Sequence, residues 1–146
     1  MDKEALAYAA GVFDGEGCVS FRKRLEHRKG KKKAYEYWLI RCEMSMTDYH
    51  VMKWFHNLVK VGTLTKRLPT KSWVGKKTQW RWRCSHRDAL IFSKLIWPWA
   101  QVKAEKIEQI INHYDEKDNV VWHPNDNIHS AKVINLKEER IKRGLK

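Results

Sequence analysis

The chain has 146 residues, an ordinary length for one domain with a buried core. Its 30 Lys and Arg against 17 Asp and Glu give a formal net charge of +13, which favours a polyanionic partner, either nucleic acid or an anionic membrane surface. No apolar run approaches the roughly 18 residues that span a bilayer, and the N-terminal residues lack the basic start of a secretory signal. We therefore expect a soluble, intracellular protein in the cytoplasm, nucleoid or an organelle matrix.

Three cysteines lie far apart in the sequence and form no Cys-x-x-Cys pair: Cys18, Cys42 and Cys84. An odd, dispersed set predicts free thiols in a reducing compartment rather than a disulfide framework. A zinc site built from them is the less favoured alternative, because structural zinc sites usually have paired ligands. We therefore expect each cysteine to be a small hydrophobic side chain of the core.

The first predicted element is a helix that begins near Lys3 and ends in the stretch from Ala9 to Gly17, Ala-Ala-Gly-Val-Phe-Asp-Gly-Glu-Gly. Its small residues recur at the three- and four-residue spacing of one helix face. They are Ala7, Ala10, Gly11, Asp14 and Gly15. A face with so few side-chain atoms lets a second helix approach closely. Gly11 costs about 1 kcal/mol of helix propensity relative to Ala, which favours a packing role for it.

Two acids, Asp14 and Glu16, lie among the glycines that should end this helix. A helix C-terminus has a partial negative charge, so each acid there costs about 0.3 to 1 kcal/mol unless a cation or hydrogen-bond donors compensate. Hard divalent cations such as Mg²⁺ prefer oxygen ligands, and Glu16 with the carbonyl of Gly15 offers such oxygens. A bound metal ion would therefore offset the unfavourable negative charge of this acid at the helix end.

Two strands and a basic turn follow the helix. Residues 18–27 alternate between polar and apolar side chains, and residues 35–46 alternate more clearly, with Trp38 and Ile40 on the apolar face. The turn between them, residues 28–33, is very basic and contains a glycine. This pattern predicts an antiparallel hairpin with one buried face.

A second helix and a second hairpin come next. Thr47 or Asp48 can cap a helix that runs to about Val59. Residues 62–68 and 78–85 read as two strands around a turn that contains Pro, Gly and lysines. In the last strand, three side chains share the apolar face, namely Trp80, Trp82 and Cys84, and the opposite face is a row of hydrogen-bond donors.

Two further helices complete the predicted core. The first begins near Asp88, is interrupted by Pro98, and has this apolar set: Leu90, Ile91, Leu95 and Ile96. The second spans residues 103–114 and has Ile107, Ile110 and Ile111 on its inner face. Residues 115–129 are polar and predict a loop, and residues 130–146 predict a short amphipathic helix. We expect a core of residues 1–114, with residues 115–146 in the same domain or appended to it.

This order predicts an α+β fold with one four-stranded antiparallel sheet covered by helices on one face. The order, over residues 2 to about 114, and the stretch from Ala9 to Gly17 resemble the LAGLIDADG family of homing endonucleases. Four positions have the family letter: Ala10, Gly11, Asp14 and Gly17. Gly15 is a common alternative to the family's Ala, and Glu16 stands where Asp is commoner.

The resemblance implies an αββαββα fold with a saddle-shaped sheet and the motif helix at a dimer axis. It implies a site-specific DNA endonuclease that depends on Mg²⁺, or on another hard divalent cation such as Mn²⁺ or Ca²⁺. The catalytic, metal-binding acid of the family falls on Glu16, with Gly15 as a carbonyl ligand. The family's basic residue falls on Lys103, which could stabilise phosphate charge or simply lie on a helix surface. The polar residue that orients water falls on Asp48, which is equally well explained as a helix cap.

A single motif in the chain implies a homodimer and a near-palindromic double-stranded DNA target. The predicted dimer interface is the small-residue face already described: Ala7, Ala10, Gly11, Asp14 and Gly15. The outward strand positions are rich in Arg, Tyr, Thr and Gln, which suit base edges in the major groove. They are Ser20, Arg22, Arg24, Tyr35, Tyr37, Arg41, Thr63, Thr65, Arg67, Gln79, Arg81 and Arg83. Glu43, just beyond this set, can accept from cytosine, and Lys31 and Lys32 of the basic turn are expected to contact phosphates.

Two other functional classes were weighed against the endonuclease. The first is a non-cleaving nucleic-acid binder on the same scaffold, either a maturase-like RNA-splicing cofactor or a DNA-binding regulator. Retention of both motif acids and of Lys103 favours the enzyme, because a binder could lose these residues freely. The second is a basic protein of the membrane surface, which is disfavoured because the helices show no apolar face flanked by Lys and Arg.

Overall fold

The computed structural model describes residues 2–118 except 74 and 76, so the predicted loop and helix of the tail lie, from residue 119 on, outside the described residues. The elements, in chain order, are α1 (Lys3–Glu16), β1 (Gly17–Glu26), β2 (Tyr35–Met46), α2 (Tyr49–Val59), β3 (Thr63–Arg67), the short 3-10 helix η1 (Lys71–Trp73), β4 (Gln79–Ser85), α3 (Arg87–Ile96) and α4 (Ala104–Asp118). This order confirms the predicted α+β class.

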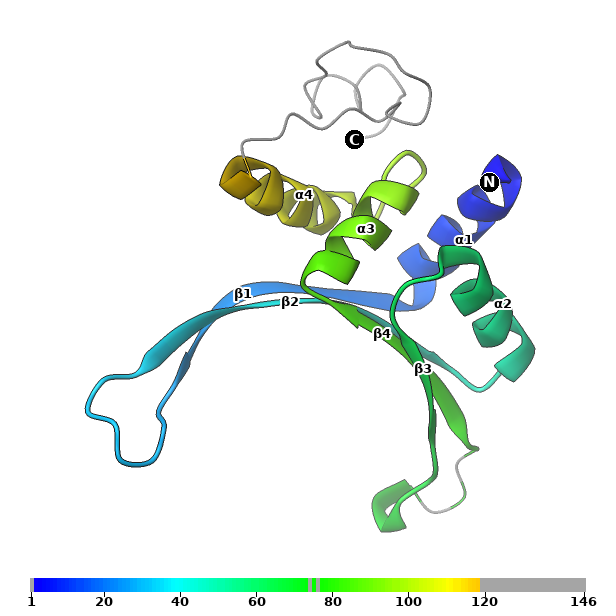
Figure 1. Cartoon of the computed structure of the whole chain (residues 1–146). Coiled ribbons are helices and arrows are strands. Elements are labelled where there is room, and N and C mark those ends of the chain that lie inside the picture. Colours follow the sequence, from blue (N-terminus) through cyan, green and yellow to red (C-terminus); the bar gives the residue numbers. More distant parts are fainter. Residues whose placement is uncertain (1, 74, 76, 119–146) are drawn as a thin grey trace.

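The four strands form one antiparallel sheet in the order β1-β2-β4-β3. Figure 1 shows the sheet as an arch, with the labelled helices on its convex side and the concave side open. The two hairpins curve away from each other at the ends of the arch. The predicted saddle with helices on one face is therefore confirmed, and it leaves the polar strand face uncovered.

Strand alternation places the core between the sheet and the helices. Ile40, Cys42 and Met44 of β2 are buried on the same face as Trp82 and Cys84 of β4. The indole of Trp82 is the centre of this core, because its ring centroid lies 6.2 Å from Phe13, 5.0 Å from Phe55 and 4.7 Å from Phe92. Its Nε1 donates to the carbonyl of Val61 at 2.9 Å, so burial leaves no unsatisfied donor on this indole.

The apolar face predicted for α3 is wrong at one position. Ile91 is 52% exposed, whereas Phe92, which was not assigned to the core, is fully buried. The buried side of this helix consists of Ala89, Phe92, Ser93 and Ile96, which recur at helical spacing. Phe92 is drawn to this side because its ring packs against the ring of Phe13 at 4.9 Å.

Two further predictions are corrected by the described residues. The helix predicted to end at Tyr114 continues to Asp118, because Asp115 pairs with Lys94 at 3.2 Å and Asp118 pairs with Arg87, which ties α4 to α3. Cys42 and Cys84 are buried as expected, but Cys18 is exposed on the open face. Among the described residues, no helix is both long enough and apolar enough to cross a membrane.

The neighbours Phe92 and Ile91 provide a matched test of the core. We expect Phe92→Ala to lower the free energy of unfolding by about 3 to 5 kcal/mol, because it removes a buried ring from the aromatic cluster. Ile91→Ala should change it by less than about 0.5 kcal/mol, because that side chain is exposed. Urea unfolding measures both, and equal effects of the two variants would contradict the assignment of the buried face.

Candidate nucleic-acid interface and catalytic centre

The predicted strand positions lie together on the concave face of the sheet. The register aligns Ser20 with Arg41 across β1 and β2, and Thr65 with Arg81 across β3 and β4. Their neighbours in each strand alternate into the core, so these positions point away from the helices. The whole predicted strand set shares this face: Ser20, Arg22, Arg24, Tyr35, Tyr37, Arg41, Thr63, Thr65, Arg67, Gln79, Arg81 and Arg83.

The middle of this face is crowded with positive charge. The pKa of Arg81 is lowered from its usual value, first by partial desolvation and then by the charges of Arg83 and Arg67. Glu43 opposes this shift; its carboxylate accepts a hydrogen bond from Nε of Arg83 at 2.9 Å and lies 2.7 Å from Nη2. Arg81 stays protonated because a guanidinium titrates far above neutral pH. The face therefore presents concentrated positive charge, as an anionic ligand requires.

The acid of the motif opens onto this basic face. Glu16 is the last residue of α1, is exposed, and lines a shallow hollow together with Glu43, Arg67, Arg81 and Arg83. The helix ends there because Gly17 turns the chain directly into β1, with its N–H bonded to the carbonyl of Phe13. A carboxylate at the helix end is thus brought beside the arginines of β3 and β4.

The other motif acid is turned toward its own chain. The carboxylate of Asp14 accepts from the backbone N–H of Gln101 at 2.8 Å and from that of Lys103 at 3.1 Å. These donors lie just before α4, so Asp14 acts as a cap for the start of that helix. The donors also compensate the acid for its position at a helix C-terminus. These contacts give Asp14 a structural role at the junction of α1 and α4.

Lys103 meets the same end of α1. Its Nζ donates to the backbone carbonyl of Asp14 at 2.6 Å and lies 6.0 Å from the ring centroid of Phe13. A cation at a helix C-terminus is favoured by the partial negative charge of the last carbonyls. The structure therefore brings Lys103 and Glu16, two residues far apart in the sequence, to one helix end.

Asp48 lies outside the group of residues around Glu16, at the start of α2. It is the N-cap of α2, where its carboxylate accepts from the backbone N–H of Val51 at 3.0 Å. It is not among the residues that line the hollow around Glu16. The contacts of Asp48 therefore support its alternative interpretation as a helix cap.

The small-residue face of α1 divides into a buried part and an open part. Ala10 is fully buried against its own chain, and Asp14 is half-buried and bonded to the start of α4, so the place of both in a dimer interface stays a prediction. Leu6, Ala9, Ala10 and Phe13 form the core-facing side of the helix. Gly11 and Gly15 face open space, since a Cβ added at either would have no neighbouring atom within 4 Å.

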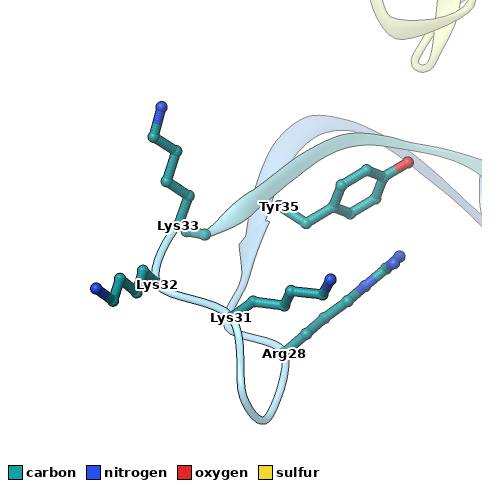
Figure 2. A pocket seen from close by; sticks show the side chains of 6 residues that line it. Arg28, Lys31, Lys32, Lys33 and Tyr35 are labelled. Carbon is teal, nitrogen blue, oxygen red and sulfur yellow. The ribbon is translucent and has the colours of Figure 1, made fainter.

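The basic turn between β1 and β2 contains a site that the sequence did not single out. The guanidinium of Arg28 lies 4.2 Å from the ring centroid of Tyr35, whose ring stacks at 5.9 Å on Tyr37. Figure 2 shows Arg28, Lys31 and Tyr35 extending in one direction, with Lys32 pointing away from them. Arg28 was missed because the turn sequence shows its charge but does not show that it stacks on an aromatic ring.

No family model matches the sequence, and no curated protein matches it. The homing endonuclease I-TnaI aligns over 97% of this chain and 99% of its own, with 14% identity and a TM-score of 0.54. The homing endonuclease I-CvuI, solved in complex with a DNA target, aligns over 97% and 96%, with 15% identity and a TM-score of 0.55.

A third match carries the family name. The LAGLIDADG homing endonuclease I-GzeII, solved in complex with its DNA target, aligns over 84% of this chain and 40% of its own, with 14% identity and a TM-score of 0.55. This chain has the fold of the LAGLIDADG homing endonucleases. The LAGLIDADG fold confirms the architecture that the motif predicted, and the motif itself occupies the second half of α1, where it runs into β1.

The two acids of the motif should have separable effects on stability. We expect Asp14→Ala to lower the free energy of unfolding by about 1 to 2 kcal/mol, because two backbone donors lose their acceptor. Glu16→Gln should change it by less than about 0.5 kcal/mol, because that carboxylate is exposed. Thermal and urea unfolding measure both, and a larger loss for Glu16→Gln would refute the roles assigned here.

Proposed function

We propose that this protein is a site-specific endonuclease that hydrolyses phosphodiester bonds in double-stranded DNA, depends on a divalent metal ion, and acts as a homodimer. The observation that carries the proposal is the position of Glu16, a carboxylate that opens onto the arginine-rich concave face while Lys103 contacts the same helix end. A carboxylate, a lysine and an anion-binding surface thus meet at one helix end, and hydrolysis of a phosphodiester requires such groups.

The concave sheet is suited to the major groove of DNA. A two-stranded ribbon is narrow enough to enter that groove, where Arg pairs with guanine and Gln with adenine. Arg81 and Gln79 of β4 are such side chains, and Lys31 at the ribbon tip is placed to contact phosphates. Solved structures with this fold include complexes with DNA, which supports DNA as the ligand of this chain.

The donor groups at the end of α1 fit a hard cation. The side-chain carboxylate of Glu16 has no hydrogen bond or ion pair within the described part of the chain. The carbonyl of Gly15 lies in the last turn of α1, where helical carbonyls lack intrahelical partners. No group of three or more His, Cys, Asp or Glu side chains occurs among the described residues. Glu16 and Gly15 therefore suit Mg²⁺ or Mn²⁺, which complete their coordination with water and phosphate oxygens.

The residues of the chain divide the chemistry among them. Glu16 would hold the cation at the scissile phosphate, and the cation when bound supplies polarisation of the phosphate and a more acidic bound water. Lys103 donates to a neutral carbonyl rather than to a carboxylate, so its charge remains available to stabilise the developing negative charge on phosphate. Asp14 holds Lys103 in place through the backbone at the start of α4.

A homodimer follows from the single motif of the chain and from the open face of α1. Ala7, Gly11 and Gly15 form a smooth strip that a second copy of α1 can approach closely about a twofold axis. Two copies would place two Glu16 side chains near that axis and two sheets along the DNA. Such symmetry fits a near-palindromic target.

Cleavage and its dependence on Glu16 can be tested together. We expect the protein to cut a library of supercoiled plasmids at specific sites with Mg²⁺ and not with EDTA, as read by sequencing the broken ends. Glu16→Gln should reduce the cleavage rate by about a hundredfold or more while DNA binding stays within about threefold, because the cation loses its charged ligand and the reading surface is unchanged.

Glu4→Gln is the matched control, because it removes the same charge at the other end of α1. It should cut at the rate of the natural protein. Specific binding without any metal-dependent break would instead support the non-cleaving regulator, and tight binding to structured RNA alone would support the maturase-like cofactor.

Gly11→Leu tests the homodimer. A side chain at this position meets nothing in the monomer, so folding should be preserved, whereas the added isobutyl group should block close approach of a second α1. We expect sedimentation to show a dimer for the natural protein and a monomer for Gly11→Leu. A dimer that persists in this variant would place the interface elsewhere.

A further inference from the structure

An ion pair on the concave face lies between neighbouring strands. Glu43 of β2 and Arg83 of β4 are direct partners in the antiparallel register. The side chains retain 27% and 33% of their exposure, so the pair is partly desolvated and more strongly held than a fully exposed one. It therefore fixes the orientation of an arginine that would otherwise have many rotamers.

The ion pair with Glu43 involves one edge of the Arg83 guanidinium, and the other edge remains open. Nε of Arg83 donates to Oε2 of Glu43 at 2.9 Å, and Nη2 lies 2.7 Å from the same oxygen. Within the described residues, Nη1 of Arg83 and Oε1 of Glu43 have no protein partner. The end-on edge, formed by Nη1 and the second hydrogen of Nη2, is thus free to bind two acceptors.

The free groups of the pair are one acceptor, Oε1 of Glu43, and the donor hydrogens that remain on Nη1 and Nη2 of Arg83. The major-groove edge of a C·G pair offers the complementary groups in a row, the N4 donor of cytosine followed by the O6 and N7 acceptors of guanine. An A·T pair does not have this row, because the thymine methyl, thymine O4, adenine N6 and adenine N7 follow a different order.

We propose that Glu43 and Arg83 act as one unit that reads a single G·C base pair in each half-site, with Arg83 on guanine and Glu43 on the paired cytosine. This inference rests on the proposed binding of double-stranded DNA. Glu43 has a second effect, because it lowers the repulsion among Arg67, Arg81 and Arg83 on the same face. It is therefore a specificity-determining residue that also positions its neighbour.

The test compares base preferences at every position of the target. Selection of bound DNA from a randomised library, in Ca²⁺ or EDTA so that no strand is cut, gives the binding profile of the natural protein. The same selection is made with Glu43→Gln, Arg83→Ala and Glu36→Gln. Glu36 is a matched control, because it pairs with Lys23 at 3.1 Å on the other face of the sheet.

We expect Arg83→Ala and Glu43→Gln to relax the same position, which is G·C in the natural profile, by about tenfold or more at that position alone. Glu36→Gln should leave the profile unchanged. Replacement of that guanine by 7-deazaguanine should weaken binding of the natural protein several-fold and leave Arg83→Ala unaffected, because the variant makes no contact with N7.

Three results would overturn the inference: relaxation at two different positions, a shared position that is A·T, or a uniform loss of affinity for all sequences. Each can occur in a protein that binds and cuts DNA, so none of them counts against the endonuclease. Absence of any sequence preference in the natural protein would refute the proposed function, and the inference with it.

Discussion

The carboxylate of Asp14 joins two parts of the fold that are 87 residues apart in the sequence. It binds the backbone that starts α4, and the carbonyl of the same residue binds the ammonium of Lys103. Because an acid at a helix C-terminus is unfavourable alone, these donors are what allow α1 to end in the motif. The fixed end of α1 in turn determines where Glu16 emerges relative to the sheet.

Charge on the concave face is balanced locally rather than overall. Partial desolvation and the charges of Arg83 and Arg67 lower the pKa of Arg81, and the charge of Glu43, which pairs with Arg83, opposes this shift. The face thus retains a strong attraction for an anion without a disordered cluster of cations. The same group of side chains therefore provides both the attraction for an anion and the fixed orientation of a guanidinium.

The strands could be predicted in detail because alternation with period two leaves little ambiguity. It correctly placed Trp82 in the core and Arg81 on the open face. Helix α3 was harder, since Ile91 and Phe92 are both apolar and only the ring of Phe13 decides between them. Ala10, which is buried, shows a related ambiguity, because a small residue fits a core as well as an interface. The partners of Asp14 and Glu43 could not be predicted, because long-range contacts have no local pattern.

The stacked side chains at the tip of the β1–β2 ribbon lie apart from the centre of the sheet. Arg28, Tyr35 and Tyr37 contact one another, whereas Glu43, Arg81 and Arg83 interact among themselves. Side chains without shared partners contribute additively, and those in one charge network do not. Substitutions in one group should therefore add to substitutions in the other, whereas substitutions within either group should not add. The tip of the ribbon and the centre of the sheet are thus two surfaces that can change independently of each other.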